Sequence, residues 1–251
     1  MKRILTFAKR CFLENIRDPL SYIFVLGFPL LMLAVMSVVN GSVPSEAGLH
    51  IFDIVNLAPA ICVFGLSFVM LFTALLLSKD RSEAFLIRLY ISPMTSVDFM
   101  LGYTLPALVI SLLQSVITTA VSAAMAAFSG EMLGIVGIIS MLAVFFPAAV
   151  LFIGFGLLFG SLLNDKSAPP LSSIIISAAS LLGGMWMDVD TMGGGFAGVC
   201  HALPFYHAVT AGRMALSGSY DGIVPHIAVV SVWAVAVFAA ASAAFHFKRR
   251  T

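Results

Sequence analysis

The chain has 251 residues, of which 61% are hydrophobic and only 10% are charged. Soluble domains contain about 45–50% apolar and about 25% charged residues, so this composition excludes a soluble enzyme and a disordered chain. The net charge of +1 excludes a nucleic-acid binder, because it supplies no basic field for a polyanion. Cys11, Cys62 and Cys200 are too far apart in sequence for a metal-ligand or disulfide pattern. The sequence therefore predicts a membrane protein.

Six apolar runs are long enough to cross the bilayer, since about 20 helical residues cover about 30 Å of hydrocarbon. In chain order they are Leu20–Val39, Ile54–Leu77, Tyr103–Phe128, Met132–Leu163, Ala168–Met187 and Ile223–Phe247. Every Lys, Arg, Asp and Glu lies outside them. A charge at mid-helix costs about 2.5–3.5 kcal/mol on the insertion scale, so this distribution is typical of spans. We predict an all-α, polytopic fold with six transmembrane helices in a single domain, residues 1–251.

The basic residues predict the orientation of these spans. Six spans place both termini on one side of the membrane, and every Lys and Arg except Arg213 then falls on that side. Loops rich in Lys and Arg stay in the cytoplasm. We therefore expect a multi-pass protein of the cell membrane with both termini cytoplasmic.

Residues 1–18 have the pattern of an amphipathic interfacial helix. Apolar side chains recur at helical spacing at Ile4, Phe7, Ala8, Cys11 and Phe12. Charged residues, among them Arg10, Glu14 and Arg17, occupy the rest of the circumference. Such a helix lies in the headgroup plane, and Asp18-Pro19 ends it before the first span.

Residues 78–101 form the most informative predicted cytoplasmic segment. Helical spacing over Ser82–Ile91 places Phe85, Leu86, Leu89 and Tyr90 on one side, and Lys79, Asp80, Arg81, Glu83 and Arg88 supply the polar remainder. Pro93 ends this helix, and Ser96 can cap the next one with Asp98 in its first turn. Two interpretations follow: a linker helix resting on the membrane surface, or a helix that docks into a cytoplasmic partner.

Residues 188–221 are predicted to lie outside the cell. They contain too many glycines for a span and are too apolar for an ordinary loop, so we expect a partial re-entrant hairpin that caps the outer end of the bundle. His201 and His207, with Asp188 and Asp190, lack a tight ligand spacing. The sequence therefore predicts no metal site.

Two further patterns leave alternatives open. Gly156-x-x-x-Gly160 permits close helix packing, either within the chain or at a dimer seam. Phe24, Phe28 and Met32 recur every four residues, which suits a core or lipid-facing stripe, or an apolar substrate path. No GxxxxGK[ST] motif occurs, so a nucleotide-driven motor would have to be another polypeptide.

Several strings, in order, resemble the type-2 permease family of ABC (ATP-binding cassette) transporters. They are Glu14-Asn15-Ile16-Arg17-Asp18-Pro19 before an apolar run with Phe28-Pro29, Asp80-Arg81-Ser82-Glu83 followed by Ile87-Arg88-Leu89 and Ser92-Pro93, and Gly183-Gly184-Met185-Trp186 followed by Leu203-Pro204-Phe205-Tyr206 and Ala211-Gly212-Arg213. The resemblance covers essentially the whole chain. One departure is that Ala84-Phe85 follows Glu83, where the family often has a glycine-threonine pair.

The resemblance implies a half-size permease of an exporter for a hydrophobic or amphipathic substrate. Two copies, or this chain and a similar permease, would form the path, and two separate ATPase subunits would bind ATP and Mg, with no cofactor on this chain. The implied roles are ATPase coupling for Asp80, Arg81, Glu83, Arg88 and Pro93, the substrate path for Phe24, Phe28 and Met32, and the external gate for Trp186, Pro204 and Arg213. The alternative function is a secondary transporter or channel that works without an ATPase.

Overall fold

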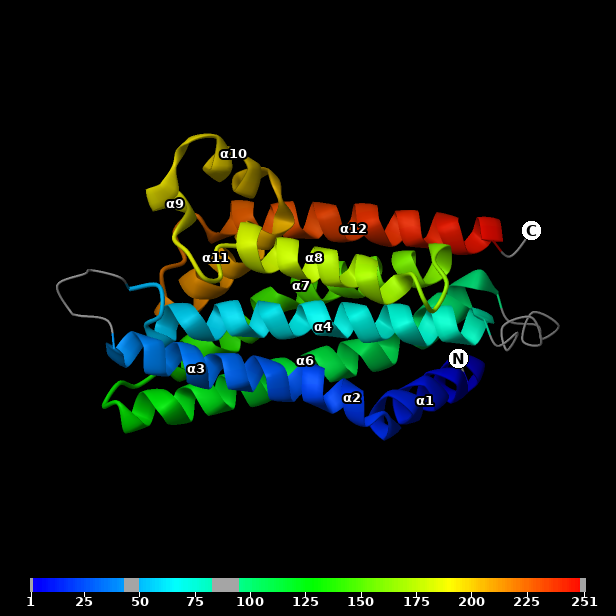
Figure 1. Cartoon of the computed structure of the whole chain (residues 1–251), viewed down its shortest axis with the longest axis horizontal. Coiled ribbons are helices and arrows are strands. Elements are labelled where there is room, and N and C mark those ends of the chain that lie inside the picture. Colours follow the sequence, from blue (N-terminus) through cyan, green and yellow to red (C-terminus); the bar gives the residue numbers. More distant parts are fainter. Residues whose placement is uncertain (1, 43–49, 83–94, 249–251) are drawn as a thin grey trace.

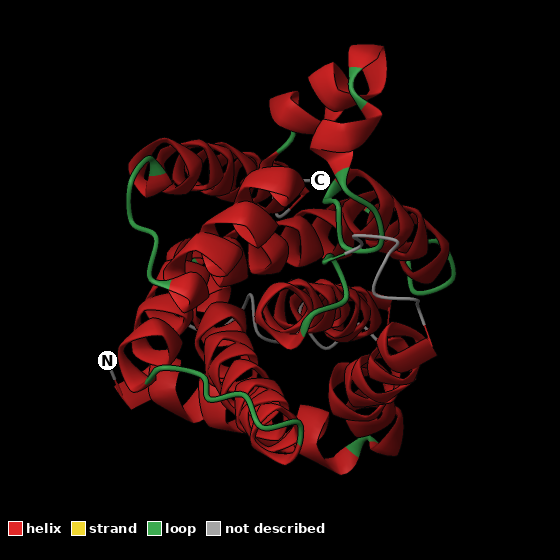
Figure 2. Ribbon diagram, turned by 90° about the vertical axis from the view of Figure 1, so that its left-hand side faces the viewer, coloured by secondary structure: helices red, strands yellow, loops and turns green. Residues whose placement is uncertain are grey.

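The computed structural model describes residues 2–42, 50–82 and 95–248, and within these ranges the chain folds into helices with no strand. The predicted all-α fold is confirmed. The long helices run side by side along the longest axis (Figure 1) and enclose a central helix when viewed from one end (Figure 2). We call the end with the chain termini the terminal end and the other the opposite end.

The first helix, α1, spans Lys2–Arg17. A continuous second stretch contains α2 (Pro19–Tyr22), a π-helical segment η1 (Ile23–Gly27) and α3 (Phe28–Ser42). The remaining elements are α4 (Ile54–Ser82), α6 (Ser96–Phe128), α7 (Ile135–Leu162), α8 (Ala168–Leu182), α9 (Val189–Met192), α10 (Gly194–Ala202), α11 (Pro204–Ser217) and α12 (Ile223–Lys248).

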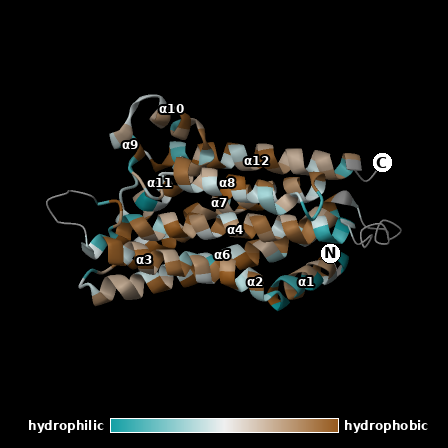
Figure 3. Cartoon of the chain, viewed as in Figure 1, coloured by the Kyte–Doolittle hydropathy of each residue, from teal (hydrophilic) through white to brown (hydrophobic). Residues whose placement is uncertain are grey.

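Within the described ranges, five helical stretches are long and apolar enough to cross a membrane. They are Pro19–Ser42, Ile54–Ser82, Val97–Phe128, Ile135–Leu162 and Ile223–Phe247. Figure 3 shows hydrophobic residues along them and hydrophilic ones gathered on α1. The other predicted run forms α8, whose 15 residues extend about 22 Å. It ends early because Gly184 adopts a positive φ of 65°. The count of six spans stays a prediction.

Helix α4 forms the centre of the bundle. Within its most apolar window, 89% of the residues are buried, against 17% in the stretch Pro19–Ser42 at the periphery. A helix that is hydrophobic around its whole circumference is stable only when other helices surround it. Accordingly α3, α6, α7, α8 and α11 all contact α4.

The Gly156-x-x-x-Gly160 pattern packs α7 against α4 within the chain. A Cβ atom at Gly156 would lie 2.6 Å from the Met70 carbonyl oxygen, and one at Gly160 would lie 2.8 Å from Leu77 Cβ. Both distances are too short for a real side chain. The intramolecular interpretation of this motif is therefore confirmed, and the two helix backbones approach closely because both positions lack a side chain.

Pro29 accounts for the π-helical turn in the first span. Without an N–H group, it cannot donate the α-helical bond to the Val25 carbonyl. The preceding residue, Phe28, donates its N–H to the Ile23 carbonyl five residues back. The helix therefore widens for one turn and continues as α3.

Two helices extend beyond the predicted apolar runs at the terminal end. Helix α4 runs to Ser82, past Leu77, and α6 starts at Ser96, ahead of the run that begins at Tyr103 and within one residue of the predicted cap. Thr95, one residue before the expected cap, forms a capping box with Asp98. Thr95 Oγ1 accepts a bond from the Asp98 N–H, while the Asp98 carboxylate accepts one from the Thr95 N–H. Placing Asp98 at the third helical position allows both bonds at once.

We expect Gly156→Ala to destabilise the protein by about 1–3 kcal/mol, because the added methyl group overpacks the contact between α7 and α4. The measurement is the thermal unfolding midpoint in detergent. Gly134→Ala is the matched control, since a Cβ at Gly134 meets no atom within 4 Å. Equal midpoints for the two variants would contradict the packing.

Candidate functional site

A buried ion pair joins three helices at the terminal end. Arg10 of α1 donates two hydrogen bonds to the Asp80 carboxylate, from Nη1 at 2.5 Å and from Nη2 at 2.7 Å. The Tyr103 hydroxyl of α6 donates a third at 2.6 Å. Asp80 itself is 0% exposed. These charge-assisted bonds replace the water that the carboxylate loses on burial, and they connect α1, α4 and α6 at one point.

Glu14 and Lys79 extend this network toward the surface. Glu14 lies 2.6 Å from Arg10 and 3.6 Å from Lys79. Beneath the ions, the Phe7 ring packs edge-on against Tyr103, with centroids 5.0 Å apart. The contact between α1 and the bundle therefore combines a polar rim with an aromatic floor. We call Arg10, Glu14, Lys79, Asp80 and Tyr103 the terminal-end network.

The pKa values on α1 reflect this setting. Burial by itself lowers the pKa of Arg10, but the hydrogen bond and the charge of Asp80 outweigh it and raise the pKa above its ordinary value. Burial raises the pKa of the Cys11 thiol to about 12. Arg10 therefore stays charged, and Cys11 stays an unreactive thiol while α1 is in place.

Arg81 contacts a different helix from its neighbour Asp80. Its Nη1 donates to the carbonyl oxygens of Gly160 at 2.9 Å and Leu163 at 3.2 Å, and also to that of Ser161. These carbonyls end α7, where the helix leaves acceptors without intrahelical donors and carries a partial negative charge. Arg81 thus caps α7 and attaches it to the end of α4.

The structure places the predicted coupling residues differently from the sequence analysis. Asp80 and Arg81 belong to the last turn of α4 and face neighbouring helices, so their assignment to the polar side of a surface helix was wrong. Helix α4 continues because Asp80 extends the buried spacing of Thr73 and Leu77. That spacing was the available signal for a buried carboxylate.

Three predicted coupling residues, Glu83, Arg88 and Pro93, lie outside the described residues. Of the residues predicted on α1, Arg10 and Glu14 join the terminal-end network, while Arg17 is exposed. Tyr103 was missed as a member of this network, because a tyrosine at the edge of an apolar run has no pattern that distinguishes it from an ordinary interfacial aromatic.

The apolar face of α1 contacts protein. Phe7, Ala8 and Cys11 are buried, and Phe7 lies against Phe99 of α6, with ring centroids 5.6 Å apart. That α1 is also interfacial stays a prediction.

A row of aromatic rings lines the contact between the first span and α4. Phe24 lies 5.9 Å and Phe28 lies 5.6 Å from Phe68, measured between ring centroids. Phe28 also lies 5.8 Å from Phe64, which contacts Trp186 at 5.5 Å. We call these five rings the aromatic row. The predicted path residues and the predicted gate residue Trp186 thus meet through Phe64.

Met32, the third predicted path residue, packs on the same side of α4 against the buried residues Leu33, Leu57 and Ile61. All three predicted path residues therefore contact the central helix, and none is a purely lipid-facing side chain. Their role in substrate passage stays a prediction.

Arg213 joins three segments at the opposite end. From α11, its Nε donates to the Asn56 carbonyl at 3.1 Å and its Nη2 donates to the Gly184 carbonyl at 2.9 Å. Burial lowers its pKa to about 10, so the guanidinium is still charged at neutral pH. Pro204 is buried in the first turn of α11, where its missing N–H is not needed. The three predicted gate residues, Trp186, Pro204 and Arg213, therefore gather at this end.

A polar cluster lies beside them. Asp190 accepts a bond from the Tyr206 hydroxyl at 2.8 Å and contacts His201 Nε2 at 3.0 Å, while His207 and His226 meet through their Nδ1 atoms at 2.7 Å. In the part of the chain that the structure describes, no group of three or more His, Cys, Asp or Glu side chains could hold a metal ion. The cluster thus serves to connect α9, α10, α11 and α12.

Removing one member of the buried pair should cost more than removing both. We expect Arg10→Ala to lower stability near the low end of the about 3–5 kcal/mol typical of broken buried pairs, because Asp80 is left charged and buried. In the double variant with Asp80→Asn, much of that loss should be regained. Thermal unfolding of the four chains in a double-mutant cycle measures the coupling. Arg3→Ala is the control on an exposed arginine, and additive effects would refute the pairing.

The family model of the ABC-2 type transporter matches residues 2–216, which includes α1, the terminal-end network and the predicted gate residues. A search of the curated proteins found no match. The matched region covers most of the chain and ends within α11, next to the Arg213 contacts. The chain therefore belongs to the ABC-2 type transporter family, and it is a multi-pass membrane protein of the permease type, the transport component with which ATPase subunits typically pair.

Proposed function

We propose that this chain is the membrane subunit of an ABC exporter, which moves a hydrophobic or amphipathic substrate outward with ATP and Mg bound on a separate ATPase. The observation that carries this proposal is the position of the terminal-end network. Asp80 and Arg81 come directly before the predicted docking helix, Ser82–Ile91, and they bind α1, α6 and α7. A push on that helix would therefore reach four helices.

The proposed arrangement places the terminal end in the cytoplasm, with both termini there. Helix α8, together with the turn at Gly183–Met187, then serves as the fifth of six crossings. Residues 188–221 re-enter from the outside. Two copies, or this chain and a similar permease, form the path along the aromatic row, above two ATPase subunits. The purified chain alone is then expected to hydrolyse no ATP.

Substrate passage requires the aromatic row to open. Phe24, Phe28 and Trp186 occupy the face of α4 between the first span and the α8–α9 turn. Movement of α3 away from α4 separates these rings, and release of the Arg213 contacts frees α11 at the outer end. The two states must bind the substrate with different affinity, or no pumping results.

Charge reversal in the docking helix tests coupling. In proteoliposomes that contain the chain and its ATPase, we expect Glu83→Lys and Arg88→Glu to abolish ATP-dependent transport while membrane insertion stays unchanged. Lys166→Glu, on the loop before α8, is the matched control. Normal transport by both reversals would refute the docking assignment. Gradient-driven flux by the chain alone, without ATP, would favour the secondary transporter or channel.

The reactivity of Cys11 reports the movement of α1. In a chain with Cys62→Ser and Cys200→Ser, we expect a membrane-permeant maleimide to label Cys11 slowly at rest, because burial raises the pKa of its thiol to about 12. Labelling should accelerate during ATP turnover with the partner ATPase, and also in the Arg10→Ala variant at rest. If neither ATP turnover nor Arg10→Ala alters the labelling rate of Cys11, α1 does not move.

A further inference from the structure

An apolar cavity of about 250 Å³ lies between α1, the start of the first span and α6. Its wall includes Phe12 and Ile16 of α1, Val25 of η1, and Ile110, Leu113 and Ile117 of α6. Asn15, Ser21 and Gln114 also line it, but they present almost no polar surface to the cavity, and Ser21 and Gln114 form hydrogen bonds within the protein. Water therefore has few partners there. The occupant must therefore be apolar where it contacts this wall.

The cavity opens onto the surface that the bilayer covers. Leu113 is 51% exposed and Ile117 is 37% exposed, and both belong to a candidate span. Tyr22, at the rim, donates its hydroxyl to the Ile16 carbonyl and so closes the corner where α1 meets α2. Aromatic residues of this kind gather at the level of the headgroups. A hydrocarbon chain entering from the adjacent lipid can reach the wall directly.

A second face of α1 leads into this cavity. Leu5, Lys9, Phe12 and Ile16 recur at i, i+4, i+7 and i+11, on a different side from the buried residues of α1. Leu5 is 59% exposed, and Lys9 and Arg17 are both exposed. No ion pair of Lys9 or Arg17 occurs among the described residues. This face carries Leu5 and Lys9, and Arg17 follows Ile16 by one residue at the end of α1. Exposed leucine with nearby basic groups suits an anionic lipid surface.

We infer that the cavity holds one acyl chain of an anionic phospholipid, whose phosphate is bound by Lys9 and Arg17. The apolar wall selects the hydrocarbon, and the two cations select the charge of the headgroup. The lipid comes from the inner leaflet if the orientation proposed above holds, and this is the one part of the inference that rests on the proposed function. A lipid in this position fills the space between α1 and the first span and so contributes to the angle between them.

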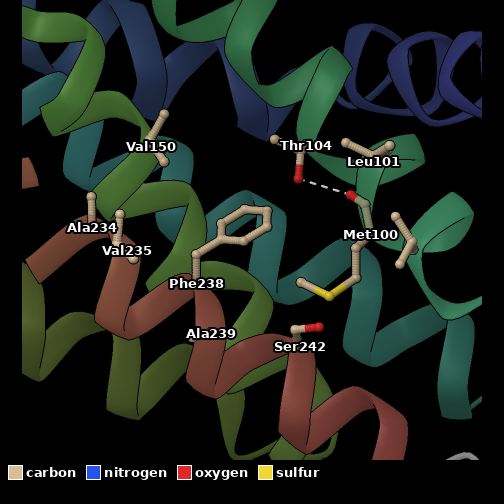
Figure 4. Close-up of a pocket in the computed structure, with 10 residues that line it drawn as sticks. Met100, Leu101, Thr104, Val150, Ala234, Val235, Phe238, Ala239 and Ser242 are labelled. Atoms are coloured by element: carbon tan, nitrogen blue, oxygen red, sulfur yellow. Dashed lines mark hydrogen bonds between the residues drawn. The ribbon is translucent and has the colours of Figure 1, made fainter. Parts of the chain in front are cut away.

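A second hollow in the structure provides an internal comparison. The groove in Figure 4 measures about 450 Å³ and lies between α6, α7 and α12, lined by residues such as Met100, Thr104 and Phe238. The Thr104 hydroxyl donates to the Met100 carbonyl at 2.8 Å, so this hydroxyl is already bonded within α6 and is not free to bind a ligand in the groove. Asp98 lies next to this lining, and the opposite charge of Arg3 acts on it, so no unbalanced basic charge is placed beside the groove by these two residues. Lipid tails that enter this groove should show no preference for an anionic headgroup.

The test uses the full chain in vesicles that contain phosphatidylglycerol or phosphatidylcholine with the same diazirine-bearing acyl chain. After photolysis, mass spectrometry locates the adducts. We expect adducts at Val25–Leu26 and Ile110–Ile117 to be more abundant with phosphatidylglycerol, by about fivefold for each basic residue. Lys9→Gln with Arg17→Gln should reduce them to the phosphatidylcholine level. Adducts at Met100–Thr104 and Ala234–Ser242 should be the same with both lipids and in both chains.

A variant that fills the cavity tests the acyl-chain part separately. Ile110→Trp should reduce adducts at Val25–Leu26 with both lipids and leave those in the Figure 4 groove unchanged. Equal labelling of the cavity by both lipids, or a preference that survives the double charge variant, would overturn the inference. So would labelling of the groove without labelling of the cavity. Because this experiment needs neither ATP nor an ATPase subunit, its failure leaves the exporter proposal untouched, and the reverse also holds.

Discussion

The pairing of the Asp80 carboxylate with the Arg10 guanidinium is the constraint on which the terminal end depends. A carboxylate at the end of the most deeply buried helix is costly unless its lone pairs are occupied, and Arg10 and Tyr103 occupy them. This requirement determines where α1 can lie. Its apolar stripe then reaches α6, where Phe7 contacts Phe99. An amphipathic N-terminal helix, which could otherwise lie on the membrane surface away from the protein, is thereby packed against the bundle.

The three levels of the bundle are joined by different interactions. Ions connect the helices at the terminal end, where Gly160 also lets α7 approach α4, and Gly156 extends this close contact toward the middle. At the opposite end, the charge of Arg213 is satisfied by the carbonyls of Asn56 and Gly184. Packing in the middle is indifferent to small changes of charge. The two ends are polar, so a change of partner or ligand alters the contacts between helices there.

Composition and charge placement predicted the helical fold and the positions of the five candidate spans, because the bilayer penalises a misplaced charge directly. Of the two alternatives for the Gly156 motif, close packing within the chain was the correct one, since close approach is a local consequence of lacking a side chain. Asp80 was misplaced, because its environment depends on Arg10, 70 residues earlier in the chain. The length of α8 depended on the backbone conformation of Gly184. The spacing of Thr73, Leu77 and Asp80 indicated that Asp80 is buried, but hydrophobic periodicity contains neither its distant partner nor the conformation of Gly184.

The wide turn at Ile23–Gly27 has a geometric consequence for the rings beside it. In an ordinary α-helix, each residue advances by about 100°, so side chains four positions apart diverge by about 40°. A turn closed five residues back advances less per residue. Phe24 and Phe28 therefore come closer to a single line along the helix, and both reach the same ring, Phe68. The π-helical turn that Pro29 imposes thus aligns Phe24 and Phe28 along one side of the first span.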